Sequence, residues 1–530
     1  MVALNVLGLL AVLLTDTAFS WMRMFVALGI SVLISLAVGI YAATSERAGR
    51  IILPVIDIFQ TIPIVTFFPF VILIFIGFLP GVIGINAAVV FLIITSMIWN
   101  IIFGVYEAIK AMPKEFADLA RLYGLSKWQK LSKVYVPVSM PRVVEQSVLS
   151  WAIGLFYLVT SEIFSAGNTA YQVKNGIGVE LTGLALSGNT FGYLLGIGIF
   201  ILFVIATRLL FFKPLEDYVV RYTKQGVSQG RISTRRRIYG RVMQLRLFRY
   251  LQSNKKAFTA YLVRKGGAGR GVKWRVAKVE KKTQKRGAAY YIILAALAVI
   301  ILYGIFRANL AADEYSVFVA LLYSFGRVWL AFIVSLAIAI PVCVYVIFLT
   351  KKSSFYLLLF QIIASIPSTI LLPEIVALMR GYAYGSELIA FIVFVLSGVW
   401  YLIFSTMHVA KSMPNNVLEV KNTFGVRGVV AWKKIYIMVI LPGLITGSIT
   451  AIGAEWNASI VAENFQNVHV GSGIGKFLDM TIASPGFRMS LSNHYLLLML
   501  LALLNIIIMI LLINTLVWKR LYSRVARIYG

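Results

Sequence analysis

Long apolar runs without charged residues constrain this chain more than any other feature. Three of them cover residues 288–306, 388–407 and 495–518, and each is close to the ~20 residues that an α-helix needs to cross a bilayer. Transmembrane β-strands would instead alternate over about ten residues, and these runs do not. Because a backbone in lipid must satisfy its own hydrogen bonds, the runs predict an all-α, polytopic helical membrane protein. A content of 60% hydrophobic and 13% charged residues agrees.

The interruptions between apolar runs divide the chain into eleven predicted spans, or twelve if the apolar start also crosses. Residues 2–14 lack the small-residue cleavage site of a signal peptide, and we expect an incomplete spanning or interfacial segment there. Proline removes a helical donor, so the spans carrying Pro69 and Pro373 are predicted to be short or bent. The predicted spans are residues 21–44, 64–79, 85–107, 143–163, 190–212, 288–306, 317–349, 366–379, 386–408, 443–463 and 494–518.

Basic residues give the expected orientation and a multi-pass location in the plasma membrane. Lys and Arg accumulate on the cytoplasmic side, which places the polar loop 112–141 inside. Residues 213–287 hold 22 Lys and Arg against three acids. This segment is interpreted as a solvated cytoplasmic linker or as a surface attracted to anionic lipid headgroups. Nucleic-acid binding is not expected, because the segment lacks clustered aromatics for stacking on bases.

An internal repeat links the two ends of the chain. One shift of 301 places residues 112–141 on residues 413–442. Upstream, Arg23 matches Arg327 at a shift of 304. The sequence therefore predicts a first half at 1–212, the basic linker at 213–287, and a second half at 288–530 with one extra N-terminal span. Parallel repeats of about five core spans each would place a pathway at their interface. Further pairs at the shift of 301 are Trp99 with Trp400, Lys110 with Lys411, and Glu162 with Glu463.

The polar segment 112–141 has the pattern of a compact folded loop. Residues 114–123 have the apolar spacing of an amphipathic helix, and Gly124 supplies its left-handed C-terminal cap. Ser126 and Gln129 fit a capping box that opens a second short helix carrying Trp128. Pro137 is expected to end that helix. An ordered loop of this kind would pass a displacement on to a partner.

These loop residues resemble a family signature. Asp118, Leu119 and Ala120, followed by Gly124 and by Val134 to Pro137, resemble the acidic-Ala-Ala…Gly…Ile-x-Leu-Pro signature of permease subunits of binding-protein-dependent ABC importers. Glu419 and Gly425 repeat the pattern, but Met438 stands where the first proline belongs and Pro442 takes the place of the second. The resemblance covers both halves, without the linker and the 288–306 span.

A second set of residues resembles one type within that family. Trp456, Asn457 and Ala458 with Glu463 resemble the Trp-Asn…Ala-Glu run of nitrate, sulfonate and taurine permeases, and Gly473 to Gly475 resemble the Gly-Leu-Gly that follows. The first half keeps Glu162 and Gly176 to Gly178, but has Leu155 and Phe156 in place of Trp-Asn. Fusion of two halves also resembles ferric-ion and thiamine permeases.

The resemblance implies a transport function with separate partners. Two ATPase subunits would dock on the two loops, and an extracytoplasmic binding protein would deliver a small solute, such as nitrate, sulfonate or taurine, to residues 166–189 and 464–493. Gly475-Lys476 lacks the frame of a nucleotide-binding loop, so this chain is not expected to be an enzyme. No cofactor, metal or catalytic pattern is predicted. The predicted coupling residues are Asp118, Ala120, Gly124, Ser126, Trp128, Pro137, Glu419, Gly425 and Pro442.

Four residues are candidates for a pathway or gate: Glu162, Trp456, Asn457 and Glu463. Glu162 and Glu463 lie about twenty residues along spans that begin inside, which brings them near the outer surface at 1.5 Å per residue. They are read either as water-exposed interfacial carboxylates or as buried acids marking a pathway. Two other functions remain open: a secondary transporter driven by an ion gradient, and a membrane scaffold whose basic linker recruits anionic partners.

Overall fold

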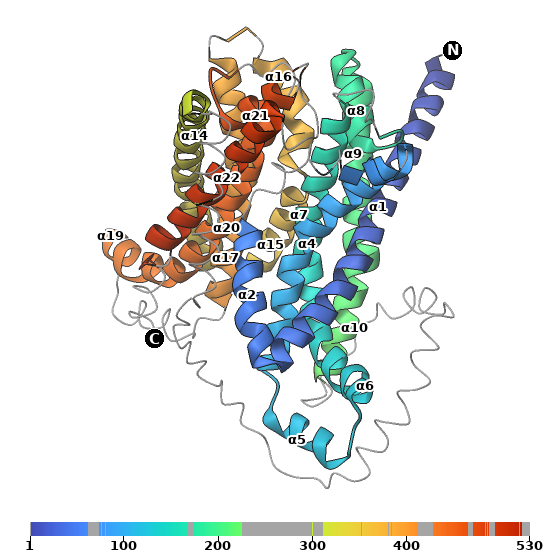
Figure 1. Ribbon diagram of the computed structural model, residues 1–530, viewed down its shortest axis with the longest axis vertical. Coiled ribbons are helices and arrows are strands. Elements are labelled where there is room, and N and C mark those ends of the chain that lie inside the picture. The colour runs from blue at the N-terminus through green and yellow to red at the C-terminus, as the bar shows by residue number, and fades with distance from the viewer. Residues whose placement is uncertain are drawn as a thin grey trace. The chain divides into compact units, whose positions relative to one another are not determined.

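The computed structural model contains only helices and connecting segments in the residues that it describes (Figure 1). The described residues are 2–61, 71, 74–75, 77–79, 81–166, 173–224, 299, 311–350, 352–379, 381–382, 384–411, 428–464, 470–482, 484, 486, 493–518 and 520–521. The chain divides into two units, Met1–Val219 with Arg286–Gly530, and Val220–Lys285.

Long helices dominate the first half. In order they are α1 (Val2–Thr44), α2 (Glu46–Thr61), α4 (Gly81–Lys110), α5 (Lys114–Leu122), α6 (Lys127–Lys130), the π-helical η2 (Leu131–Tyr135), α7 (Val136–Ala166), α8 (Ile177–Leu186), α9 (Thr190–Ala206), the π-helical η4 (Thr207–Phe212) and α10 (Lys213–Lys224). The helix α4 packs extensively against both α1 and α7.

The second half also consists of long helices joined by shorter ones. Its elements are α14 (Ala311–Val344), the π-helical η5 (Tyr345–Leu349), α15 (Ser353–Ala364), the 3₁₀ turn η6 (Ser368–Leu371), α16 (Leu372–Met379), α17 (Gly385–Lys411), α19 (Gly428–Ala431), the π-helical η7 (Trp432–Tyr436), α20 (Ile437–Asn464), α21 (Ile474–Ile482), α22 (His494–Ile513) and the π-helical η8 (Asn514–Trp518). Here α17 packs against α20 and α14.

Eight helices in the described residues are long and apolar enough to cross a membrane, and a bent pair makes up to nine. The eight coincide with predicted spans 21–44, 85–107, 143–163, 190–212, 317–349, 386–408, 443–463 and 494–518. The span predicted to carry Pro373 is short, since α16 covers only Leu372–Met379, but the bend lies before it: Phe355–Ala364 and Ser368–Val376 meet at 63°. Pro367 lies at this break, where it cannot donate a backbone hydrogen bond. The predicted spans 64–79 and 288–306 fall largely outside the described residues.

The apolar start of the chain continues directly into the first predicted span. Residues 2–14 are the first turns of the single helix α1, because apolar residues continue without a break into the 21–44 span. The segments around Arg50 and Lys352 introduce the helices α2 and α15, which the predicted spans did not include. Glu46, Arg47, Arg50 and Asp57 interrupt the apolar residues of α2, and α15 has only 12 residues, so neither contains an uncharged run long enough to be predicted as a span.

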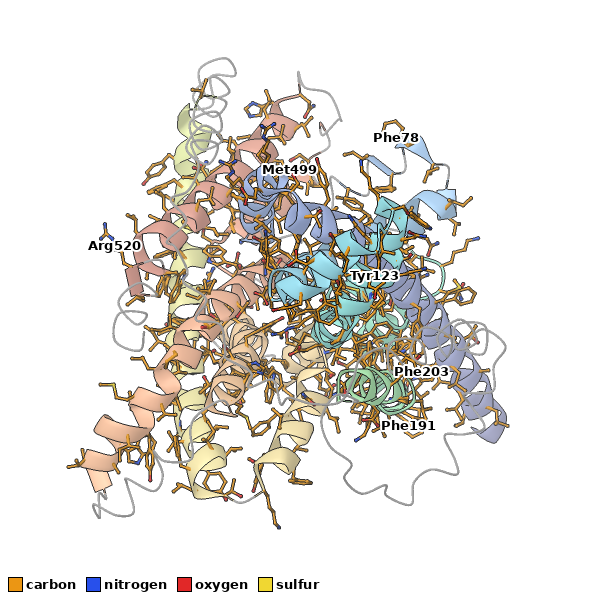
Figure 2. The ribbon with its side chains drawn as sticks, turned by 90° about the horizontal axis from the view of Figure 1, so that it is seen from below. Phe78, Tyr123, Phe191, Phe203, Met499 and Arg520 are labelled. Carbon is orange, nitrogen blue, oxygen red and sulfur yellow. The ribbon has the colours of Figure 1, made fainter. Side chains whose placement is uncertain are left out.

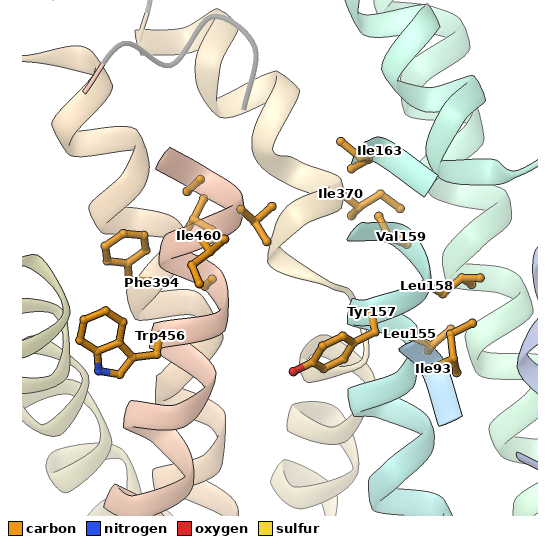
Figure 3. Packing of buried hydrophobic residues seen from close by; sticks show 14 of the residues in the cluster. Ile93, Leu155, Tyr157, Leu158, Val159, Ile163, Ile370, Phe394, Trp456 and Ile460 are labelled. Carbon is orange, nitrogen blue, oxygen red and sulfur yellow. The ribbon is translucent and has the colours of Figure 1, made fainter. Parts of the chain in front are cut away.

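The halves also meet in the core of the larger unit. One cluster of buried apolar side chains includes residues from both halves, among them Leu158, Ile370 and Ile460. The hydroxyl of Tyr193 on α9 donates a hydrogen bond to the backbone carbonyl of Ile370 on η6. Figure 3 shows Tyr157 of α7 and Trp456 of α20 among these packed residues. The short turn η6 is therefore a point of contact between the halves.

Glycines let the two central helices of each half approach closely. The glycine lies on the first of these two helices in one half and on the second helix in the other half. In the first half, Gly104 of α4 faces Gln146 of α7, whose Cγ would lie 2.6 Å from an added Cβ. At the corresponding place in the second half, Gly447 of α20 lies against Ser405 of α17, whose Cβ would lie 3.0 Å from an added Cβ. Small residues at such contacts allow close backbone packing, which is the main source of helix association in lipid.

Candidate functional site: a helical loop and two buried arginine clusters

The loop between α4 and α7 has the internal order that its sequence predicts. Gly124 has φ +61°, the left-handed conformation that other residues adopt only at a cost, and the backbone N–H of Leu125 donates to the carbonyl of Ala120 at 3.1 Å. The capping box is also present: Gln129 N–H donates to Ser126 Oγ at 3.3 Å, and Ser126 N–H donates to Gln129 Oε1 at 3.0 Å. Both predictions are confirmed.

The loop exposes apolar side chains that nothing in the described chain covers. Leu122 is 80% exposed and Trp128 is 74% exposed, whereas Ala120 is buried. Phe116, Leu119 and Tyr123 are also exposed. Figure 1 shows α5 and α6 beyond the ends of α4 and α7, and Figure 2, seen from below, shows the side chain of Tyr123. Exposed apolar residues gathered on one element mark an interaction surface.

The loop continues into the membrane span without a break. Leu131 and Val136, which follow α6 and η2, both have right-handed helical backbone angles. The helix therefore runs from Lys127 to Ala166, and the prediction that Pro137 ends it was wrong. Pro137 lies in the first turn of α7, directly after the π-helical segment. At this position the wider π turn accommodates a residue without an N–H donor.

Loss of the capping box should loosen the start of this long helix. We expect Ser126→Ala to destabilise α6 by about 1 kcal/mol, because the N–H of Gln129 loses its acceptor. Hydrogen exchange of the α6 amides should quicken while the exchange of α7 amides stays unchanged. Ser132→Ala is the matched control, since its hydroxyl only donates to the carbonyl of Trp128 within the same helix. Equal effects of the two substitutions would contradict the capping role.

The second copy of the loop is described only in part. Glu419 and Gly425 lie outside the described residues, which resume with Gly428 at φ +60°. Val429 is 70% exposed at the position that corresponds to Trp128. Pro442 lies inside α20, as Pro141 lies inside α7. The exposed apolar start of this second helix thus resembles the first.

A buried arginine holds the first half together at the far end of α7. Arg23 of α1 pairs with Glu162 of α7, with 2.8 Å between Nη1 and Oε1, and its Nε donates to Asn86 Oδ1 of α4 at 2.7 Å. The hydroxyl of Ser20 donates to the same Glu162 oxygen at 2.7 Å. The N–H of Gly178 donates to Glu162 Oε2 at 2.8 Å. The carboxylate of Glu162 therefore binds α1 and also accepts a bond at the first turn of α8, where a helix favours negative charge.

The second half builds the same cluster from matching residues. Arg327 of α14 pairs with Glu463 of α20 at 3.0 Å, and Ser324 donates to Glu463 Oε1 at 2.7 Å. The N–H of Gly475 donates to Glu463 Oε2 at 2.9 Å. One member differs, since Glu387 takes the place of Asn86 and accepts from Arg327 Nη2 at 2.7 Å. The second cluster thus carries two carboxylates on one arginine, where the first has a carboxylate and an amide.

These contacts explain the Gly-Ile-Gly runs. A Cβ on Gly176 would lie 2.7 Å from the Glu162 carboxyl carbon, and a Cβ on Gly473 would lie 2.6 Å from that of Glu463. The first glycine of each run is therefore required for close approach of the carboxylate. The third glycine supplies the N–H donor. Because Ser20 and Ser324 share the shift of 304 with the arginines, the repeat held a signal for these partners that the sequence-based interpretation did not use.

The structure corrects the interpretation of the candidate pathway residues. Glu162 is 0% exposed and Glu463 is 2% exposed, so they are not water-exposed interfacial carboxylates. Their arginine and serine partners lie on other helices, so the spacing of residues along one helix could not reveal them. Trp456 is buried in the apolar core, and Asn457 donates its side-chain amide to the carbonyl of Gly453 on its own helix. The structure does not bring Trp456 and Asn457 into the arginine cluster.

Comparison with known proteins supports the loop signature. Residues 35–214 match the family described as the binding-protein-dependent transport system inner membrane component. The first half thus matches a permease domain. Together with the eight candidate spans, this match indicates a multi-pass protein of the plasma membrane.

Three relatives illustrate the similarity. The glycine betaine/proline betaine transport system permease protein of Escherichia coli K12 is 29% identical over 216 residues, which cover 39% of this chain and 57% of that protein. Its counterpart from Salmonella typhimurium is 31% identical over 184 residues, covering 34% and 48% of the two chains. The nitrate import permease protein of Synechococcus elongatus is 28% identical over 139 residues, covering 26% and 47%. The chain spans about half the length of these curated relatives.

Proposed function

We propose that this protein is the transmembrane subunit of an ATP-driven importer whose pathway lies between two permease halves. The loop of α5 and α6 carries the proposal, because it combines an exposed apolar surface with a helix that continues unbroken into the span α7. The match of residues 35–214 to a binding-protein-dependent transport component supports it.

In this proposal the loops 112–141 and 413–442 receive two ATPase subunits. Trp128 and Leu122 fill apolar sites on the first ATPase, and Asp118, which is exposed on α5, faces its polar rim. Closure of the ATPases moves each loop, and a rigid helix carries that movement into the bundle. An extracytoplasmic binding protein delivers the solute at the opposite end of the spans. The basic linker 213–287 is proposed to lie on the cytoplasmic side, either as a solvated segment or as a surface attracted to anionic lipid headgroups.

The proposal includes two parallel repeats of one fold. The arginine clusters support it, since Arg23, Ser20 and Glu162 correspond to Arg327, Ser324 and Glu463 and make the same kinds of hydrogen bonds. We assign Glu162 and Glu463 a positioning role: each fixes the end of a long helix against α1 or α14 and against α8 or α21. The pathway then runs between two internally rigid halves.

The solute is proposed to be small. Relatives are named for glycine betaine, bicarbonate and nitrate, while the Trp-Asn…Ala-Glu resemblance favours nitrate, sulfonate or taurine. Competition between these compounds in an uptake assay with the binding protein would separate the classes. An ion-coupled secondary transporter is the alternative function, and it predicts uptake by the purified chain alone. Copurification of an ATPase with the chain, and uptake only when ATP is supplied, would decide between them.

A substitution at Gly124 tests the coupling role of the loop. We expect Gly124→Val to retain the fold but to lower uptake and solute-stimulated ATP hydrolysis roughly tenfold, since a left-handed β-branched residue costs about 1–2 kcal/mol. The open space around Gly124 excludes a steric clash as the cause. Gly188→Val is the matched control, because Gly188 has φ +73° and is also unobstructed, but lies outside the loop. Normal coupled uptake in Gly124→Val would refute the proposal.

A further inference from the structure

Glu455 is a further buried acid, and it lies in the same span as Glu463. Glu455 is on α20, two turns before Glu463, and its side chain is 0% exposed. It lies within the candidate span Ile437–Glu463, away from both ends. An ionisable side chain in such a position is costly and usually has a function. The resemblance and the clusters described above give Glu455 no role.

Glu455 differs from the other two buried glutamates in its partners. The hydroxyl of Ser335 on α14 donates to Oε1 at 2.9 Å, and Oε2 has no hydrogen-bond partner in the described part of the chain. Glu162 and Glu463 each have an arginine and a backbone N–H. A charged carboxylate at position 455 would therefore be buried with one neutral donor, which costs several kcal/mol.

Among the side chains that the structure describes, none on the neighbouring helices pairs a charge with Glu455. The Ser335 hydroxyl is the donor that the described residues supply to its carboxyl group, although α20 packs against α14, α17, α21 and η7. Arg327 is held by Glu387 and Glu463 instead. The charged and titratable residues on these elements are Asp313, Glu314, Tyr315, Tyr323, Arg327 and Cys343 on α14, Glu387, Tyr401, His408 and Lys411 on α17, Lys433, Lys434 and Tyr436 on η7, Glu463 on α20, and Lys476 and Asp479 on α21.

The backbone of α17 is shaped to receive this side chain. Gly398 lies directly against the Glu455 carboxyl group, and any Cβ there would overlap it. In the first half the corresponding pair is reversed, because Met97 of α4 packs its methyl group against Gly154 of α7. The glycine at this helix contact therefore faces a methionine methyl group in the first half and a glutamate carboxyl group in the second half.

We propose that Glu455 is a proton-binding site at the contact between α17 and α20, occupied by a proton in this arrangement and emptied when the contact opens. The neutral acid replaces the methionine of the first half without burying a charge. When the helices separate, water reaches Oε2 and accepts the proton, and the resulting carboxylate opposes closure. The site makes the second half sensitive to proton activity, whichever solute and motor the protein uses.

Infrared spectroscopy of the purified full chain in lipid nanodiscs tests the occupied state. At neutral pH we expect Glu455→Gln to remove a protonated-carboxyl C=O band from the wild-type spectrum. Glu463→Gln is the control, and it should remove ionised-carboxylate bands instead. Loss of only carboxylate bands in Glu455→Gln would overturn the proposal, since it would show an ionised side chain at this position.

Thermal unfolding against pH provides a second readout that does not depend on the spectrum. The wild-type chain should lose thermal stability as the pH rises above the ordinary pKa of glutamate, because the unfolded side chain ionises there while the buried one keeps its proton, and Glu455→Gln should lack this step. The double substitution Gly398→Met with Glu455→Gly transfers the first-half pair to the second half, and it should also lack the step. A step that persists in both variants would refute the proposal, as would a loss of stability at neutral pH in Glu455→Gln as large as that in Glu463→Gln.

Discussion

Replacement of Arg23 by Ala is expected to lower the free energy of unfolding by about 3–5 kcal/mol. The substitution leaves the Glu162 carboxylate buried at 0% exposure without its cation, and it also removes the bond to Asn86. The remaining donors, Ser20 and the N–H of Gly178, are neutral and only partly compensate. Unfolding in detergent, followed by circular dichroism at increasing denaturant concentration, measures the loss.

An exposed ion pair provides the matched control for Arg23. Arg142 and Glu145 are paired at 2.8 Å with 45% and 44% of their side chains exposed. Because water screens such a pair, Arg142→Ala should cost less than about 1 kcal/mol. Comparable losses in the two variants would show that the Arg23 cluster does not hold the first half together. The replacement of Arg327 should cost at least as much as that of Arg23, since two carboxylates then lose their partner.

A leucine at Gly443 is expected to destabilise the second half by about 3 kcal/mol. Gly443 of α20 lies against the backbone of α17, where an added Cβ would meet Thr406 Cα at 2.5 Å and Ser405 O at 3.0 Å. Both atoms belong to the backbone, so no side-chain rotation can relieve the overlap and the two helices must separate. Thermal unfolding of the purified chain and its yield from membranes should both fall.

Gly453 serves as the control on the same helix. A Cβ added to Gly453 would have no neighbour within 4 Å, so Gly453→Leu introduces the same side chain without the backbone overlap. We expect this variant to match the wild type, or to exceed it slightly because glycine is a poor helix former. If both leucine variants unfold at the same temperature, close packing of α17 and α20 is not what stabilises this half.

Features that depend on neighbouring residues in the sequence were predictable. The apolar runs located the eight long spans, because the thickness of a bilayer fixes their length. Gly124 and the pair of Ser126 with Gln129 were also predictable, since turn and cap chemistry acts over three or four residues. The short helix that carries Pro373 was predicted in the same way, whereas the bend itself lies at Pro367.

Features that depend on contacts between distant helices were not predictable from spacing. The partners Arg23 and Glu162 are separated by 139 positions, and only the fold brings them together. The distinction between Glu455 and Glu463 likewise requires knowledge of α14, where Ser335 and Arg327 lie at different depths. For Pro137 a local rule failed, because the π-helical segment before it lets the helix continue.

The exchange of small and large residues between the halves has a consequence for how the protein assembles in the membrane. If α4 associated with α20 during insertion, Met97 would clash with Glu455, while Gly104 and Gly447 would leave a gap. If α17 associated with α7, Gly398 and Gly154 would leave the gap, and Ser405 would crowd Gln146. Each incorrect helix pair therefore has a steric overlap at one contact and a void at the other, whereas each correct pair has neither. The positions of small and large side chains thus disfavour pairing of a helix from one half with the wrong helix of the other half.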